Sequence, residues 1–136
     1  MSGRRDEFAA AAESLVGTPF RFRGREPHSG LDCVGLVIAA LQRIGSAAPP
    51  VPPYAMRQRD FAAQITTVAA AGFESVHDAV RPGDLLLLQA GPAQVHLAIA
   101  GRGGGVIHAH AGLGRVVITP PPCPLPIERH WRLRED

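Results

Sequence analysis

The chain has 136 residues, of which 46% are hydrophobic and 19% charged, a balance typical of one globular domain spanning residues 1–136. Fourteen basic residues against twelve acidic ones give a net charge of +2, which is too small for a nucleic-acid-binding surface. No apolar stretch approaches the roughly 18 residues of a membrane span, and the first residues lack the apolar segment of a secretory signal. We therefore expect cytoplasmic synthesis, no membrane span and no nucleic-acid partner.

Three helices are predicted in the first half of the chain. Asp6–Val16 is rich in alanine and is followed by a glycine that favours a helix end. Cys33–Ile44 carries apolar residues at helical spacing, and Gly45 ends the pattern. Asp60 is a good N-cap for a third helix that closes at Gly72.

The second half of the chain has the pattern of strands. A Pro-Gly turn precedes an apolar run of leucines, and glycine-rich turns separate the segments that follow. The predicted strands are Leu85–Leu88, Val95–Ala100, Val106–His110, Arg115–Thr119 and Glu128–Arg134. Helices followed by an antiparallel meander predict an α+β fold, with the N-terminal helices packed on a sheet of about five strands.

Cys33 lies in the first turn of the second predicted helix. Unpaired backbone N–H groups and the helix dipole favour negative charge there, so we expect a thiolate with a lowered pKa. The same N–H groups can stabilise an oxyanion. The alternative is that Cys33 simply begins the buried stripe of the helix, since free cysteine packs as a small apolar residue.

Two histidines on successive predicted strands complete a catalytic pattern. If the hairpin between them folds symmetrically about Arg102, His96 lies directly opposite His108, and one imidazole can orient the other. A nucleophilic cysteine needs such a base and orienting group. A register centred on Gly103 pairs His96 with His110 instead, which makes His110 the second candidate for the orienting role.

Two other uses of these side chains remain open. Cys33, His96 and either His108 or His110 have the ligand types of a catalytic zinc site. The chain has no local metal-binding motif such as His-Glu-x-x-His, so we expect neither a metal nor another cofactor. A disulfide between Cys33 and Cys123 would block the nucleophile, but a cytoplasmic start keeps thiols reduced.

Five segments, taken in chain order, resemble the signatures of the NlpC-type cell-wall cysteine peptidase family. They are Gly17–Phe20, Asp32–Val37, Arg81–Leu85, His96–Ile99 and Ile107–Ala109. The resemblance extends from Glu13 to Thr119. The short chain, the Asp-Cys-Val-Gly-Leu sequence and the ending His130–Leu133 look most like the phage and gene-transfer-agent branch, which is associated with tail structures.

The resemblance implies a papain-like α+β fold and a cysteine endopeptidase that cleaves peptidoglycan stem peptides, usually between D-γ-glutamate and the diamino acid. It implies Cys33 as nucleophile, His96 as base and His108 as the third polar residue. It also makes Asp32 a candidate for binding the free amine of the substrate. At this position Asp32 is equally well explained as a helix N-cap.

Two departures from the family pattern affect the substrate site. Phe20 stands where the family usually has tyrosine, and the loss of a hydroxyl that donates to an oxyanion lowers rates roughly 100- to 1000-fold. Val34 replaces the usual serine after the nucleophile. These changes favour the alternative of a weak or inactive tail component with the same fold. The expected partners are a peptidoglycan stem peptide and phage-tail-like proteins, with access to the wall through a particle or lysis.

Overall fold

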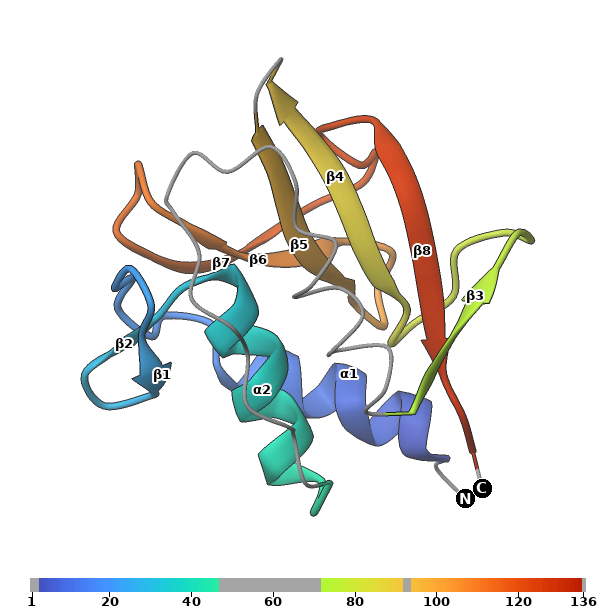
Figure 1. The fold of residues 1–136 in the computed structure, drawn as a ribbon, viewed down its shortest axis with the longest axis horizontal. Helices are drawn as coiled ribbons and strands as arrows, with labels where there is room; N and C mark the ends of the chain where they lie inside the picture. The colour runs from blue at the N-terminus through green and yellow to red at the C-terminus, as the bar shows by residue number, and fades with distance from the viewer. Residues whose placement is uncertain (1–2, 47–71, 92–93, 136) are drawn as a thin grey trace.

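A six-stranded antiparallel sheet lies against two helices in the protein, whose structure is a computed structural model describing residues 3–46, 72–91 and 94–135 (Figure 1). The strand order is β3-β8-β4-β5-β6-β7, and the short strands β1 and β2 form a separate pair. The helices are α1 (Arg4–Ser14) and α2 (Cys33–Arg43). The strands are β1 (Arg25–Glu26), β2 (Gly30–Leu31), β3 (Phe73–Val76), β4 (Leu85–Gly91), β5 (Gln94–Ala100), β6 (Val106–His110), β7 (Arg115–Thr119) and β8 (Ile127–Leu133).

The predicted α+β class is confirmed, and so are two helices and all five predicted strands, with small shifts at their ends. The third predicted helix lies outside the described residues. The sequence analysis missed β3, an edge strand that pairs with β8 from Phe73 opposite Leu133 to Val76 opposite His130. Four residues are too few for a clear alternation of apolar and polar side chains.

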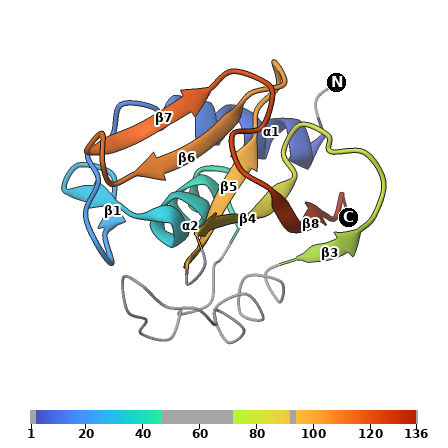
Figure 2. The ribbon, with the colours of Figure 1, turned by 90° about the horizontal axis from the view of Figure 1, so that it is seen from above.

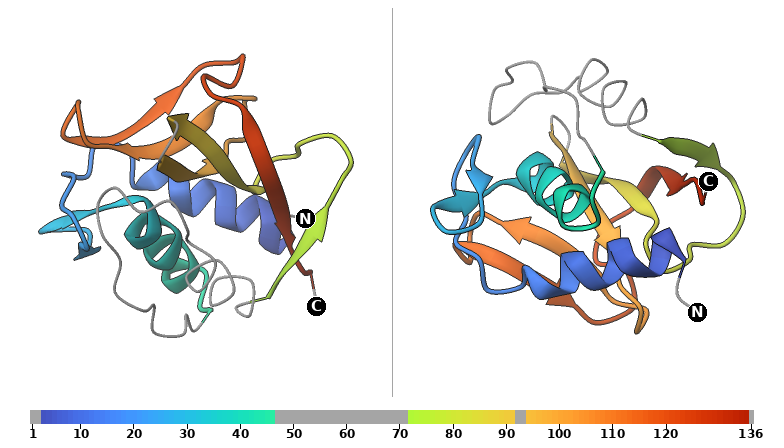
Figure 3. Two further views of the ribbon diagram at one scale, coloured as in Figure 1. Left: turned by 45° about the horizontal axis from the view of Figure 1, so that its top comes forward. Right: turned by 90° about the horizontal axis from the view of Figure 1, so that it is seen from below.

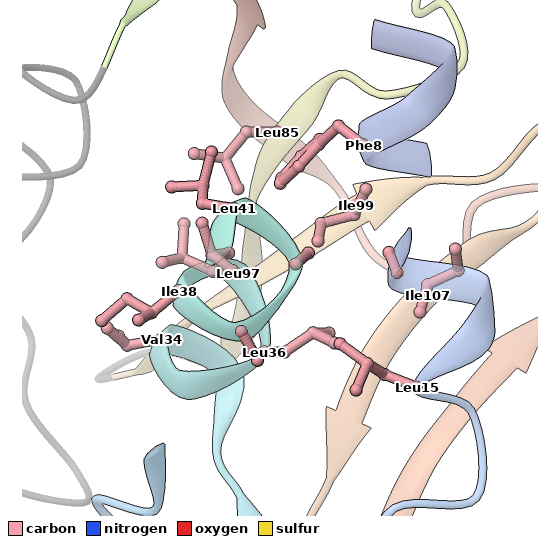
Figure 4. Packing of buried hydrophobic residues seen from close by; sticks show 14 of the residues in the cluster. Phe8, Leu15, Val34, Leu36, Ile38, Leu41, Leu85, Leu97, Ile99 and Ile107 are labelled. Carbon is pink, nitrogen blue, oxygen red and sulfur yellow. The ribbon is translucent and has the colours of Figure 1, made fainter. Parts of the chain in front are cut away.

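The main core fills the space between the helices and one face of the sheet. Both helices lie on that face (Figure 3). Side chains from both helices meet those of the strands, as Figure 4 shows for Phe8, Leu15, Leu36, Leu41, Leu85, Leu97, Ile99 and Ile107. Burying each such side chain contributes about 1.5–3 kcal/mol. Helix α2 is buried from Val34 to Leu41, so its position relative to the sheet is tightly fixed.

The β5–β6 hairpin folds about Gly103, and the predicted centre at Arg102 is wrong. Ile99 pairs with Ile107, and the N–H of Gly101 donates to the Gly105 carbonyl at 2.8 Å. Only two residue pairs form this ladder before the strands separate. Strands β6 and β7 run side by side (Figure 2) and cross β5 at a steep angle (Figure 1). Strands β5 and β6 therefore diverge beyond these two pairs.

An ion pair fixes the start of β4 against β8. Asp84 is fully buried, and its two carboxylate oxygens each accept from the Arg132 guanidinium at 2.9 Å. The backbone N–H of Arg81 also donates to Asp84 at 2.9 Å. The Arg-Pro-Gly-Asp-Leu segment therefore shapes the turn into β4, and its aspartate has a structural role.

Gly35 is required where the loop before β1 packs on α2. A Cβ atom at this position would overlap the carbonyl oxygen of Gly24. We expect Gly35→Ala to lower the free energy of unfolding by about 1–3 kcal/mol, because the loop must move away from the helix. Urea unfolding measures this. Gly103→Ala is the control, since nothing lies within 4 Å of a Cβ there. Equal stability of the two variants would contradict the close approach.

Candidate active site

The position of Cys33 depends on the N-terminal cap of α2. The Asp32 backbone is extended, and its side chain accepts a hydrogen bond from the Gly35 N–H at 2.9 Å. This cap starts the helix at Cys33. The cysteine is thus in the first turn, as the sequence predicts.

The Cys33 sulfur lies beside β5 at Leu97, the residue that follows His96. Ala100 exchanges hydrogen bonds with Gly83 and Asp84 at the β4 edge, both at 2.8 Å. Because successive residues of a strand point their N–H groups to opposite edges, the Leu97 N–H points away from β4. This N–H points at the Cys33 sulfur and lowers the pKa of the thiol. The sulfur therefore lies where β5 and β6 have separated.

His96 and His108 form a hydrogen-bonded pair. His96 Nε2 lies 3.1 Å from His108 Nδ1, and the two rings meet nearly edge to face, with centroids 5.2 Å apart. With the hairpin centred on Gly103, the two histidines share a face and are diagonal neighbours, a separation that imidazole rings can span. The predicted contact therefore exists, although the register predicted for it is wrong.

His110 has a different role from the one considered for it. Its Nδ1 accepts the backbone N–H of Leu113 at 3.0 Å, which holds the turn between β6 and β7. Its ring lies 5.7 Å from that of His108. His108, and not His110, is the partner of His96.

Thr119 on β7 is the site residue that sequence reasoning missed. Its Oγ1 lies 2.9 Å from His108 Nε2. In the β6–β7 ladder, Val106 pairs with Thr119 and His108 with Val117, so Thr119 is diagonal to His108 on the same face. The strand itself is predictable from the sequence, but its register is not, and the register decides which β7 side chain reaches the histidine.

The carboxylate of Asp32 is already engaged. Besides capping α2, it accepts the Arg23 N–H at 2.8 Å and the Arg25 guanidinium at 3.0 Å, and the residue is only 3% exposed. The interpretation of Asp32 as an N-cap is confirmed. Its role in binding a substrate amine stays a prediction, and would require the amine to reach a carboxylate that already has three donors.

The two departures from the family pattern lie in different environments. Phe20 is partly buried, packs against the main core and forms an isolated bridge with Leu31, two residues before Cys33. A ring therefore lies near the site, without a hydroxyl. Val34 is fully buried in the core, so the structure does not place it on a substrate subsite.

The electrostatics of the site favour neutral groups. Burial, followed by the charge of Asp32, raises the pKa of Cys33 to about 11, against the backbone N–H groups of Leu97 and Val34. Burial, followed by the charges of His108 and His110, lowers the pKa of His96 to about 4. The shift of the Cys33 pKa is opposite in direction to the expected one, because burial and a neighbouring carboxylate outweigh the helix N–H groups.

The alternatives of a metal site and a disulfide find no support in the described part of the chain. Residues 3–46, 72–91 and 94–135 contain no group of three or more histidine, cysteine, aspartate or glutamate side chains placed to hold a metal ion. Cys33 and Cys123 are both free thiols. Nor is any helix among these residues long and apolar enough to cross a membrane.

Two helices packed on one face of an antiparallel sheet, with a cysteine at the start of α2 and a histidine pair on β5 and β6, are typical of an α+β domain of the papain-like type. The chain belongs to the NlpC/P60 family, whose model matches residues 17–134. No protein of curated function matches it in sequence.

Solved structures of the family share the fold. NlpC2 from Trichomonas vaginalis is similar over 98% of this chain and 47% of its own, with 20% identity and a TM-score of 0.72. The chain thus spans about half the length of that protein. The NlpC/p60 domain of the peptidoglycan hydrolase SagA is 27% identical, with a TM-score of 0.57, over 86% of this chain and 89% of its own. The P60 domain of antigen MAP1204 from M. avium subspecies paratuberculosis is 19% identical, with a TM-score of 0.61, covering 97% and 95%.

The partly buried His96 predicts an acid-sensitive fold. The pKa of His96 is about 4 when folded, against an ordinary 6.5, so the unfolded chain binds more protons between these values. The free energy of unfolding therefore falls by about 3 kcal/mol as the pH drops through this window. Urea unfolding from pH 4 to 8 should show this, and His96→Gln should shrink the loss. His28→Gln, in an exposed loop, is the control. An unchanged acid limb in His96→Gln would contradict the account.

The raised pKa of the Cys33 thiol predicts slow alkylation at neutral pH. In a Cys123→Ser background, the rate of reaction with iodoacetamide should keep rising from pH 6 to 9.5, because the thiolate is the reactive form. Asp32→Asn retains a capping side chain and removes a charge that raises the pKa, so it should react faster at each pH. A fast, pH-independent reaction near pH 6 would show a resting thiolate and overturn this assignment.

Proposed function

We propose that the protein is a cysteine endopeptidase that hydrolyses peptidoglycan stem peptides. The observation that carries this proposal is a histidine pair joined at 3.1 Å, one member of which directly precedes Leu97, the β5 residue whose N–H acts on the Cys33 sulfur. Membership of the NlpC/P60 family supports it. Similarity to the NlpC/p60 domain of a peptidoglycan hydrolase, at 27% identity, supports the choice of substrate.

The reaction begins with neutral groups. In the tautomer this reaction needs, His96 donates from Nε2 to His108 Nδ1, 3.1 Å away, and Nδ1 of His96 is left to accept the thiol proton. Since the resting thiol is protonated, this proton transfer accompanies attack of the sulfur on the scissile carbonyl carbon. A C–S bond forms, and the carbonyl oxygen becomes an oxyanion. The N–H groups of Cys33 and Val34 at the start of α2 stabilise it.

Product release restores the starting state. The tetrahedral intermediate collapses, the C–N bond breaks, and His96 gives its proton to the departing amine. The acyl group remains as a thioester on Cys33. Water then attacks the thioester while His96 takes a proton from it, and the thiolate leaves and is reprotonated. No cofactor takes part in these steps.

The finer parts of the proposal rest on the resemblance of the sequence motifs. The bond cleaved is the one between D-γ-glutamate and the diamino acid of the stem peptide. The Asp-Cys-Val-Gly-Leu motif and the His130–Leu133 sequence support association with phage-tail or gene-transfer-agent proteins. Such a particle, or lysis, would bring a protein made in the cytoplasm to the cell wall.

A second candidate is a tail component that keeps the fold without catalysis. Three observations favour it: Phe20 lacks the hydroxyl of the family pattern, the Asp32 carboxylate is occupied, and the Cys33 thiol is neutral. In this case the domain would bind stem peptide or a tail partner and release no product.

Digestion of purified muropeptides tests the choice. Cys33→Ala should abolish product formation, and His96→Ala should lower kcat about 100- to 10,000-fold, the range for a lost general base. Mass spectrometry of the products identifies the bond cleaved. Cys123→Ser and His77→Ala, which lie outside the site, should retain the wild-type rate. Equal product from wild type and Cys33→Ala would overturn the peptidase, and binding without cleavage by wild type would establish the second candidate.

A further inference from the structure

His108 has a partner on each of its ring nitrogens. Nδ1 faces His96 Nε2 at 3.1 Å, and Nε2 faces Thr119 Oγ1 at 2.9 Å. The residue is only 5% exposed. Three strands therefore contribute one side chain each to a continuous row, with the imidazole of His108 in the middle.

A neutral imidazole carries a single N–H, so this row has two directions. In the first, His108 donates from Nε2 to Thr119 and accepts at Nδ1 from His96. The Nδ1 of His96 is then unprotonated and can take the proton of Cys33. In the second, Thr119 donates to His108, His108 donates to His96, and the proton of His96 stays on Nδ1. That direction leaves the thiol without a base.

A hydroxyl group ends the row, one group beyond the position next to the base, which a carboxylate takes in Ser-His-Asp triads and His108 takes here. The groups facing His108 are His96 from β5, His110 from its own strand and Thr119 from β7. None of these is an acid, and no carboxylate bonds to His108 within the described residues. The threonine is β-branched and therefore stiff at χ1, which keeps its oxygen directed at the ring.

We propose that Thr119 is a positioning residue that holds the proton of His108 on Nε2, so that His96 presents an unprotonated Nδ1 to Cys33. This inference rests on the proposed peptidase function for its kinetic consequence, but its consequence for the tautomer of His108 stands independently. Thr119 does not touch the reacting atoms and acts only through the histidine pair.

Kinetics of two substitutions separate positioning from packing. Thr119→Val keeps the shape and removes the hydroxyl, and should lower kcat on muropeptides about 10- to 100-fold with little change in KM, as expected for the loss of an orienting partner. Thr119→Ser restores the hydroxyl and should recover most of the rate. Ile118→Val, on the same strand and 44% exposed, is the control for a small change in side-chain size.

The ¹⁵N shifts of the His108 imidazole report the tautomer without any substrate. Wild type and Thr119→Ser should carry the proton on Nε2, while Thr119→Val should shift it toward Nδ1. The same tautomer in wild type and Thr119→Val, or a wild-type proton on Nδ1, would overturn the inference. If the tautomer shifts as expected but wild type cleaves no muropeptide, the positioning role stands and the peptidase proposal fails. Urea unfolding confirms that each variant is folded.

Discussion

The contact between the start of α2 and β5 is the constraint on which the site depends. The Asp32 cap fixes the first residue of the helix, and burial from Val34 to Leu41 fixes how the helix lies on the sheet. Together they hold Cys33 against β5, with its sulfur at the point where β5 and β6 separate. The register centred on Gly103 makes His96 a diagonal neighbour of His108, and their rings are in contact.

The same contact suppresses ionisation of the thiol. Burial and the capping carboxylate of Asp32 raise the pKa of Cys33, and only Arg25 and two backbone N–H groups act against them. Burial likewise disfavours the charged form of His96. The proposed nucleophile and base are therefore neutral at rest, and in the proposed reaction proton transfer accompanies the attack on the substrate carbonyl. For the proposed reaction, the ring nitrogen of His96 that carries the proton then matters more than the charge of the resting thiol.

The sequence predicts the features that depend on neighbouring residues, and it does not predict those that depend on distant segments of the chain. The helix that begins at Cys33 and the β5–β6 hairpin are local, so apolar spacing and glycines predict them. The register about Gly103 depends on how the five-residue turn closes, and the contact of His108 with Thr119 depends on the register of a further strand. The direction in which the thiol pKa shifts depends on burial by segments distant in sequence. The position of a cysteine at a helix start does not reveal this burial.

A crystal structure of the protein with a stem-peptide aldehyde tests the central claim most directly. An aldehyde carbon that bonds to a catalytic thiol mimics the tetrahedral intermediate. The account predicts a covalent bond to Cys33 Sγ, with the new oxygen on the N–H groups at the start of α2. It also predicts His96 Nδ1 within hydrogen-bond reach, about 3 Å, of the adduct. An adduct out of reach of His96, or no adduct at Cys33 at saturating aldehyde, would contradict it.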